Sequence, residues 1–297
     1  MLTLRGHTDG VMCVAAADDG HVLTGSGDKT VKVWRGDELV RTIEPHTDVV
    51  FAVAVLPGGA RFISGSEDRT AKLCTFGGGL ERTFEVGSVV RCVAVLPDGV
   101  HFVVGLGNSE VRLYHVDGTL VHTFKGHASF VNAVTVTPDG QHIISGADDN
   151  LVKVWSVASK SLVSTCGEED NEDPSIGHTD LVEAVTAMPD GQRFLSGSTD
   201  FTVRVWLIDG THQNTFQLHT SLVLALVALP DNQHALSGSD DSTIKLFNVN
   251  DGTVLRNFTH HTDAVRSFTL LPDGLRFISG SHDQTARIVY HGLAPVR

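Results

Sequence analysis

Apolar residues occur along this chain in short stretches of five to eight positions, rich in Val, Ile, Phe and Thr and separated by Gly, Asp and Pro. This pattern predicts β-strands rather than helices. In one stretch the expected strands cover residues 50–56, 61–65, 70–76 and 80–84. The turn at 57–59, Pro-Gly-Gly, joins the first two strands, because proline fixes φ and glycine supplies the conformations that follow.

The same pattern recurs seven times along the chain. Each copy is a variant of His-Thr-Asp-x-Val, then Leu-Pro-Asp-Gly, then Ser-Gly-Ser-x-Asp-x-Thr-x-Lys-x-Trp. Successive copies begin 39, 40, 41, 51, 41 and 42 residues apart, at His7, His46, Val86, His127, His178, His219 and His261. A period of about 40 residues is typical of a four-stranded unit that cannot bury its own faces and therefore stacks on its neighbours.

The two ends of the sequence predict how these units close into a ring. Residues 1–6 are similar to the fourth-strand segments 40–43 and 121–124, whereas the last copy supplies three strands, up to about Tyr290. We therefore expect residues 1–6 to form the outer strand of the last unit, which leaves no major sheet edge unpaired. Length alone suggests about two domains, but the unbroken repeat predicts a single domain over residues 1–297.

These motifs resemble the WD-repeat β-propeller family over essentially the whole chain. The matching positions include the Ser-Gly-Ser runs, the turn aspartates and Trp34, Trp155 and Trp206. The resemblance implies an all-β fold with seven blades, each a four-stranded antiparallel sheet. None of the three tryptophans is followed by Asp, and the Trp-Asp-x-Arg motif that receptors of cullin ubiquitin ligases often carry after the third strand does not occur.

Composition narrows the function classes. The formal net charge of −13 argues against nucleic-acid binding, since non-specific binding to phosphates requires a basic surface. No apolar run approaches the ~20 residues that cross a bilayer, and Met1 does not begin a secretory signal, so no membrane insertion is expected. The four cysteines form neither a disulfide framework nor a metal pattern. We expect an intracellular, cytoplasmic protein without a cofactor.

A hydroxyl, a histidine and an aspartate recur together in six copies, as in the catalytic triad of hydrolases. The resemblance instead implies six structural chains, each running from the turn aspartate through the histidine to a hydroxyl on an inner strand, and on to the tryptophan indole where one exists. An active nucleophile needs an exposed oxygen beside oxyanion donors, so we predict no catalytic residue and no enzyme. The sets are Thr24, His7, Asp28 and Trp34; Ser64, His46 and Asp68; Ser145, His127, Asp149 and Trp155; Ser196, His178, Asp200 and Trp206; Ser237, His219 and Asp241; and Ser279, His261 and Asp283.

The third copy lacks every member of this set. Val86 replaces the histidine, Val104 the hydroxyl, Asn108 the aspartate and Tyr114 the indole. Replacing all partners together by apolar groups can be nearly neutral for stability. The alternative is that this blade was reshaped for a ligand, and the sequence leaves both interpretations open.

The resemblance also implies a contact face, at the end where the histidine loops meet the turn aspartates; we call it the narrow face. Three positions per copy point there: those before and after the first-strand valine and the one before the turn aspartate. Apolar side chains surrounded by charges are typical of a protein-binding hot spot, and the arginines could receive a carboxylate or a phosphorylated motif. The alternative is that the apolar side chains pack between blades. The candidates are Val49, Phe51, Arg91, Phe130, Leu181, Leu222, Leu224 and Arg266.

Metal binding is disfavoured at the two places where acidic residues or histidines gather. Residues 166–176 interrupt the period with five carboxylates in six positions, but they lack the alternating ligands and internal glycine of a calcium loop. A solvated, mobile loop is the preferred interpretation. His260, His261 and His282 suggest zinc, but His261 already belongs to a structural set and no cysteine cluster accompanies it.

We interpret the chain as a non-enzymatic scaffold that binds a protein or peptide partner on the narrow face, as a monomeric domain or a subunit of a larger complex. One alternative is an enzyme with its active site at the central channel. Another is one recognition domain of a larger signalling or ciliary protein. Fold alone does not decide among them.

Overall fold

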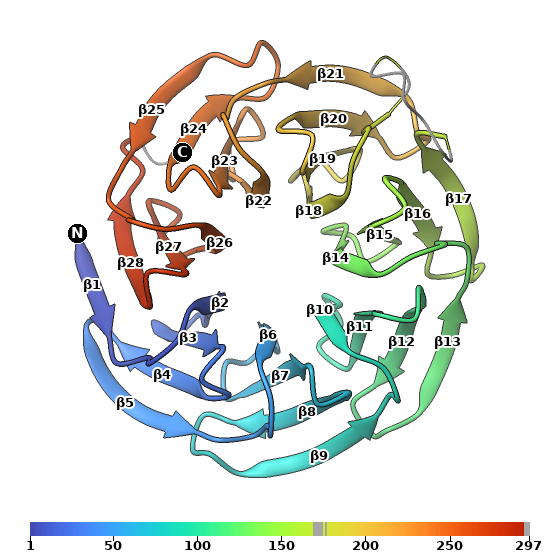
Figure 1. Ribbon diagram of the computed structural model, residues 1–297. Helices are drawn as coiled ribbons and strands as arrows, with labels where there is room; N and C mark the ends of the chain where they lie inside the picture. The colour runs from blue at the N-terminus through green and yellow to red at the C-terminus, as the bar shows by residue number, and fades with distance from the viewer. Residues whose placement is uncertain (169–174, 176, 294–297) are drawn as a thin grey trace.

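The computed structural model describes residues 1–168, 175 and 177–293. Within these residues the chain forms 28 strands and no helix. The strands form seven antiparallel sheets of four, arranged around a common axis (Figure 1). The all-β, seven-bladed propeller predicted from the repeat is confirmed.

Each blade runs outwards from the axis in chain order. Blade 1 consists of β2 (Val11–Ala16), β3 (His21–Ser26), β4 (Val31–Arg35) and β5 (Glu38–Ile43). Blade 2 consists of β6 (Val50–Val55), β7 (Arg61–Ser66), β8 (Thr70–Thr75) and β9 (Leu80–Glu85). Blade 3 consists of β10 (Val90–Val95), β11 (His101–Leu106), β12 (Val111–His115) and β13 (Leu120–Phe124). Blade 4 consists of β14 (Val131–Val136), β15 (His142–Ala147), β16 (Val152–Ser156) and β17 (Ser161–Cys166).

The remaining three blades continue this order and close the ring. Blade 5 consists of β18 (Val182–Ala187), β19 (Arg193–Ser198), β20 (Val203–Leu207) and β21 (His212–Phe216). Blade 6 consists of β22 (Val223–Ala228), β23 (His234–Ser239), β24 (Ile244–Asn248) and β25 (Val254–Phe258). Blade 7 consists of β26 (Val265–Leu270), β27 (Arg276–Ser281), β28 (Thr285–Tyr290) and, as its outer strand, β1 (Leu2–Arg5).

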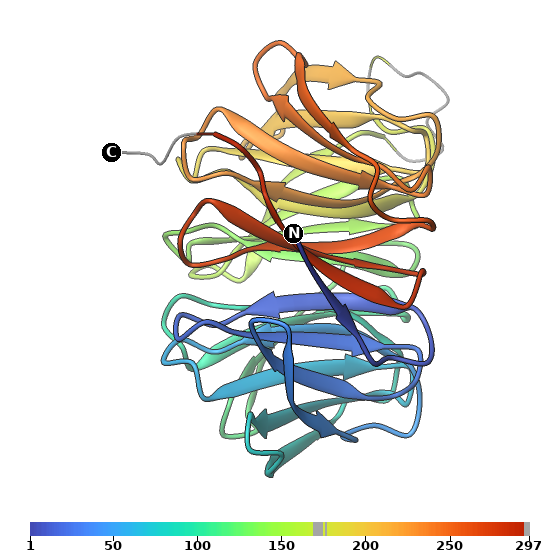
Figure 2. The same ribbon diagram turned by 90° about the vertical axis from the view of Figure 1, so that its left-hand side faces the viewer.

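The N-terminal strand closes the ring as the sequence predicted. β1 pairs antiparallel with β28, with Leu2 opposite Ile288 and Arg5 opposite Thr285. Figure 2 shows this strand, in dark blue, lying against the red strands of the last blade. Because β1 occupies the outer edge of β28, blade 7 has the same four-stranded form as the other six.

The core lies between blades, and the Ser-Gly-Ser motif explains how neighbouring blades approach so closely. A Cβ on Gly65 would collide with the side chain of Val90 in the next blade. Glycine is therefore required for this close approach. The flanking serines satisfy polar groups: Ser66 Oγ accepts the Asp68 N–H at 3.1 Å and donates to the Asp48 carbonyl at 3.2 Å. One tripeptide thus serves both blade packing and the turn above it.

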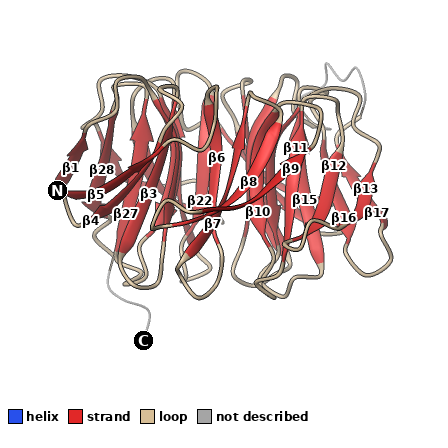
Figure 3. Cartoon of the chain, turned by 90° about the horizontal axis from the view of Figure 1, so that it is seen from below, coloured by secondary structure: helices blue, strands red, loops and turns tan. Residues whose placement is uncertain are grey.

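Loops gather at the two ends of the ring, while the strands run between them (Figure 3). At the narrow face, the carbonyl before each first-strand valine accepts a backbone hydrogen bond from the residue before the turn aspartate, as in Glu67 N to Val49 O at 3.0 Å and Asp148 N to Phe130 O at 2.9 Å. All seven blades have this bond. It ties the histidine loop to the turn and fixes the backbone of the face.

Candidate functional site

The residue after each first-strand valine is a β-bulge. In blade 2, Val50 pairs with Ser66 and Ala52 pairs with Gly65, so Phe51 has no partner on the neighbouring strand. The same shift occurs in all seven blades. A bulge re-aims the extra side chain, and here it directs one residue per blade towards the axis. These seven residues, which we call the mouth ring, are Met12, Phe51, Arg91, Asn132, Glu183, Leu224 and Arg266.

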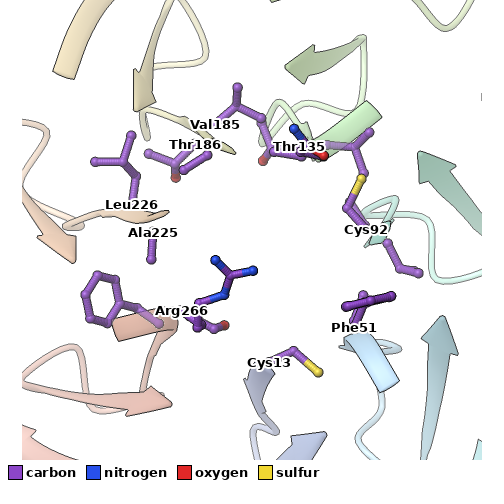
Figure 4. Close-up of a pocket in the computed structure, with 18 of the residues that line it drawn as sticks. Cys13, Phe51, Cys92, Thr135, Val185, Thr186, Ala225, Leu226 and Arg266 are labelled. Carbon is purple, nitrogen blue, oxygen red and sulfur yellow. The ribbon is translucent and has the colours of Figure 1, made fainter. Parts of the chain in front are cut away.

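The mouth ring surrounds the entrance to the central channel. It encloses a cavity of about 80 Å³, and the channel to which it leads has a volume of about 420 Å³. Figure 4 shows Arg266 reaching into the open centre, with Phe51 across from it and Cys13 and Cys92 on the wall. The ring combines two guanidinium groups with one carboxylate, an amide and three apolar side chains.

Two side-chain contacts hold part of the ring in place. The Arg91 guanidinium lies over the Phe51 ring, 4.8 Å from its centroid, within the range of a cation–π contact. Asn132 Nδ2 donates to Asp148 Oδ1 at 2.5 Å, and its Oδ1 is buried without a hydrogen-bond partner among the described residues. Burial lowers the pKa of Arg266, and the positive charge of Arg91 acts in the same direction, against the raising effect of Glu183.

The position before each first-strand valine lies outside the mouth ring. Here the side chain of Phe130 is 48% exposed, whereas Val49, Leu181 and Leu222 are half-buried. Phe130 lies beside the turn of blade 3, since a Cβ on Gly107 would come within 3.8 Å of its ring. We call these four residues the apolar rim.

The eight candidate residues therefore divide into two groups that the sequence did not distinguish. Four form the apolar rim, and four belong to the mouth ring: Phe51, Arg91, Leu224 and Arg266. Leu224 is only 6% exposed, so it is wrong to treat it as an exposed anchor. The physical reason is the bulge, which points its side chain across the channel rather than outwards. The equivalent residues Met12, Asn132 and Glu183 were not singled out, although their identical place in the repeat was the available signal.

Beneath the narrow face, blade 4 holds one of the six polar chains. Trp155 Nε1 donates to Ser145 Oγ at 2.8 Å, and the hydroxyl in turn lies 2.8 Å from His127 Nε2. His127 Nδ1 lies 2.9 Å from Asp149 Oδ2. Because an ionised carboxylate only accepts, Nδ1 carries the proton and Nε2 accepts from the serine. The proton order therefore runs from indole to hydroxyl to imidazole to carboxylate.

The other five sets repeat this geometry. Their histidine–aspartate and histidine–hydroxyl distances all fall between 2.7 and 2.9 Å. Trp34 and Trp206 donate to Thr24 and Ser196 as Trp155 does to Ser145. All six hydroxyl residues are 0% exposed. A substrate has no access to a hydroxyl that is fully buried.

In four of the six sets the ionisation of the histidine agrees with that proton order. Burial lowers the pKa of His178 and outweighs the raising effect of Asp200. The lowered pKa keeps the imidazole neutral. Burial lowers the pKa of His7, His46 and His219 in the same way. For Asp200, burial acts to raise the pKa, but the hydrogen bonds that the carboxylate accepts from His178 and Thr202 outweigh it and hold the pKa well below its ordinary value.

Blade 3 replaces the polar chain with apolar packing. Val104 is 0% exposed, and the rings of Phe102 and Tyr114 stack at 5.6 Å between centroids. Arg112 takes over part of the loop anchoring, since it donates to Glu110 and to the carbonyl of Val86 at 2.9 Å. Val86, Val104 and Tyr114 are buried, and only Asn108 reaches the surface.

The channel wall offers weak nucleophiles. Burial raises the pKa of the Cys92 thiol to about 12, and it raises the pKa of Cys13 further, so both are protonated at neutral pH. Among the described residues that line the channel and its mouth, Glu183 is the one carboxylate and no histidine occurs. General acid–base catalysis typically needs such a group with its pKa tuned near the working pH.

The two regions considered for metal binding differ in what the structure describes. Residues 169–174 and 176, which hold most of the acidic insertion, lie outside the described residues. Within residues 1–168, 175 and 177–293, no three His, Cys, Asp or Glu side chains gather in a way that would hold a metal ion. In the same residues, no helix is long and apolar enough to span a membrane.

Comparison with known proteins agrees with the geometry. The sequence model described as "WD domain, G-beta repeat" matches residues 1–35, 37–74, 118–156, 174–206, 210–248 and 252–289. The stretch between the second and third matches, 75–117, contains most of blade 3. The family signature is therefore weakest where the polar chain is missing.

Similar curated proteins share only part of their length with this chain. A phospholipase A-2-activating protein of Xenopus laevis is 40% identical over 57 residues, 19% of this chain and 7% of that protein. A pre-mRNA-processing factor 19 of Oryza sativa subsp. japonica is 36% identical over 76 residues, 24% and 14% of the two chains. An uncharacterised WD repeat-containing protein of Synechocystis is 34% identical over 68 residues, 22% and 20% of the two chains. The matched part thus covers a fifth or less of each relative.

Proposed function

Because this chain belongs to the WD40 repeat family, we propose that it is a non-enzymatic scaffold that binds a protein or peptide partner on its narrow face. The observation that supports this most strongly is Phe130, a large aromatic side chain left 48% exposed on that face. Aromatic residues are enriched among hot spots of protein interfaces. An exposed aromatic ring on the same face as the half-buried aliphatic residues of the apolar rim fits the anchor of such an interface.

The backbone beneath the apolar rim supports this role. The loop–turn bond of each blade and the polar chains below it hold the narrow face in place before any partner arrives. Little conformational freedom is lost when a partner binds a preorganised surface, which favours affinity. The narrow face is thus a rigid platform with apolar anchors around a charged centre.

A role inside a larger assembly or a longer protein is part of this proposal. The curated relatives contain matched segments that make up between 7% and 20% of their own length. The free cysteines, all buried, are in keeping with a reducing, intracellular compartment. The enzyme alternative finds no supporting observation in the described channel wall, where the polar groups lack a carboxylate pair or a histidine.

The test is Phe130→Asp, with partner binding and melting temperature measured on the same purified protein. We expect the partner to bind about thirtyfold more weakly, as is typical when a hot-spot residue is lost. Folding should be retained, because the side chain contributes little to the blade core.

Leu162→Asp is the matched control for this experiment. Leu162 lies in the same blade, is 47% exposed and sits on the outer strand β17. It should leave binding unchanged. If Phe130→Asp unfolded the protein, Phe130 would belong to the core. If folding and binding both persisted, the contact site would lie elsewhere on the propeller.

A further inference from the structure

The mouth ring carries a charge opposite to that of the protein around it. Its two arginines against one glutamate leave a net charge of +1, whereas the whole chain has a formal net charge of −13. A positive centre inside an acidic molecule focuses anions onto one point of its surface. Here that point is the axis of the propeller, at the centre of the apolar rim.

Arg266 differs from the other partly buried arginines in its hydrogen bonding. Within the described residues, its guanidinium forms no hydrogen bond and no ion pair. Elsewhere in the protein the partly buried arginines are paired: Arg112 binds Glu110, and Arg193 binds Asp190 at 2.8 Å. Removing a guanidinium from water without an acceptor is costly, so an anion bound at the mouth would relieve this cost.

Arg91 provides the second side of the same opening. Its guanidinium face is held by the ring of Phe51 at 4.8 Å. The N–H groups at its edge remain for hydrogen bonding, because a cation–π contact uses the face of the guanidinium. Both arginines line the cavity of about 80 Å³ at the mouth. Since a water molecule occupies about 30 Å³, this space suits a group the size of a carboxylate.

We propose that the mouth ring receives the carboxylate of a partner's Asp or Glu side chain between Arg91 and Arg266. This inference rests on the proposed function and names the chemistry of its central contact. Planar carboxylates match the fork of N–H groups that a guanidinium presents. The apolar rim then holds the neighbouring residues of the same peptide.

The charges of the face favour a carboxylate over a phosphate. One carboxylate neutralises the net charge of +1 in the ring. A phosphorylated residue carries about −1.5 to −2 charges, so it would leave excess negative charge beside Glu183. Around the ring, Glu67 and Asp240 are exposed and acidic. We therefore expect the partner's acidic residue to be flanked by basic or neutral residues rather than by further acids.

Short degenerate peptides with one fixed central residue test this assignment. The central residue is Glu, Gln, phosphothreonine or Thr, and binding to the purified protein is followed by fluorescence polarisation. We expect Glu-centred peptides to bind the wild type about tenfold or more tightly than Gln-centred peptides. Arg266→Gln should abolish this preference, while Arg266→Lys should keep part of it because it keeps the charge.

The controls separate the failure of this inference from the failure of the proposed function. Arg82→Gln removes the same charge from an exposed position on the outer strand β9 and should leave the preference intact. Equal binding of Glu- and Gln-centred peptides, lost in Phe130→Asp, would overturn the carboxylate site and support the narrow face. A preference for phosphothreonine over Glu would overturn the charge argument. Peptide binding that neither Phe130→Asp nor Arg266→Gln changes would overturn both proposals, and so would no binding by any peptide.

Discussion

Blades 3 and 4 are neighbours with the same strand arrangement and opposite ways of holding it together. Blade 4 buries a chain of four polar side chains from Trp155 to Asp149, whereas blade 3 buries valines and stacked aromatic rings at the same positions. The loop–turn bond is nevertheless the same, with Gly107 N to Val89 O at 2.9 Å in blade 3. The difference teaches that a blade can fill the same positions with either of two solutions, a polar chain or apolar packing.

The largest expected effect comes from mixing the two solutions in blade 3. Val104→Ser would bury a hydroxyl where neither a histidine nor an indole stands ready to pair with it, and would also remove apolar volume. We expect the free energy of unfolding to fall by about 2–4 kcal/mol. Chemical denaturation of the purified variant measures this. Val104→Thr nearly keeps the side-chain volume and should lose less free energy of unfolding. An unchanged denaturation midpoint in both variants would refute the idea that the apolar packing of blade 3 excludes a single polar group.

The next effect comes from breaking the polar solution in blade 4. His127→Ala would leave Asp149 and Ser145 without their shared partner, at a cost of roughly 1–3 kcal/mol. The fourfold variant with Val, Val, Asn and Tyr at positions 127, 145, 149 and 155 copies blade 3, and should be less destabilised than the single effects predict. Denaturation midpoints for the four single variants and the fourfold variant decide this. Simple additivity would mean that the two solutions are not alternatives.

A smaller effect is expected on the pH dependence of stability. Blade 7 has two adjacent histidines, His260 and His261, whereas blade 3 has no histidine in place of the polar chain. Burial lowers the pKa of His260 to about 4, and the neighbouring imidazole of His261 and the charge of Arg287 act in the same direction. Between about pH 6.5 and 4 the unfolded state therefore binds a proton that folded His260 does not, so stability falls as the pH falls through this window. We expect His260→Gln to flatten the loss of melting temperature between pH 7 and 4. An identical pH profile in the variant would contradict this.

The smallest effect concerns a turn residue whose backbone has the left-handed conformation, with positive φ, in every blade. Phe201 has φ of 69° and Asn150 has φ of 65° at the equivalent place in blade 4. Left-handed geometry is tolerated by asparagine and strained for a bulky aromatic residue. Phe201→Asn should stabilise the protein by up to about 1 kcal/mol, and Asn150→Phe should destabilise it by a similar amount. Opposite shifts of the two denaturation midpoints are the expected result, and shifts of the same sign would refute the strain.

The strands and their order could be predicted from the sequence because the same strand pattern recurs in seven copies. The expected strands 50–56 and 61–65 lie within one residue of β6 and β7. The hydrogen-bonded sets were implied by the resemblance to WD-repeat propellers, at residues whose spacing recurs in six copies.

The direction of individual side chains on the narrow face could not be predicted in the same way. Strand alternation assigns residues to faces by a period of two, and a bulge adds one residue that this period does not count. Phe51 and Val49 therefore looked alike in the sequence, although one lines the channel and the other stands at the rim. Only the pairing of Val50 and Ala52 with the neighbouring strand reveals the extra residue.

The pairing of β1 with β28 also sets the timing of folding in the cell. The partner of residues 2–5 lies at residues 285–288, at the opposite end of the chain. At about 5–20 residues per second, a ribosome needs roughly 15–60 s to make the intervening chain. During that interval the early blades can form one by one from local hairpins, while β1 has no strand to join. Ring closure therefore waits until residues 285–288 have been made, and β1 is the strand of blade 7 that waits longest for its partner.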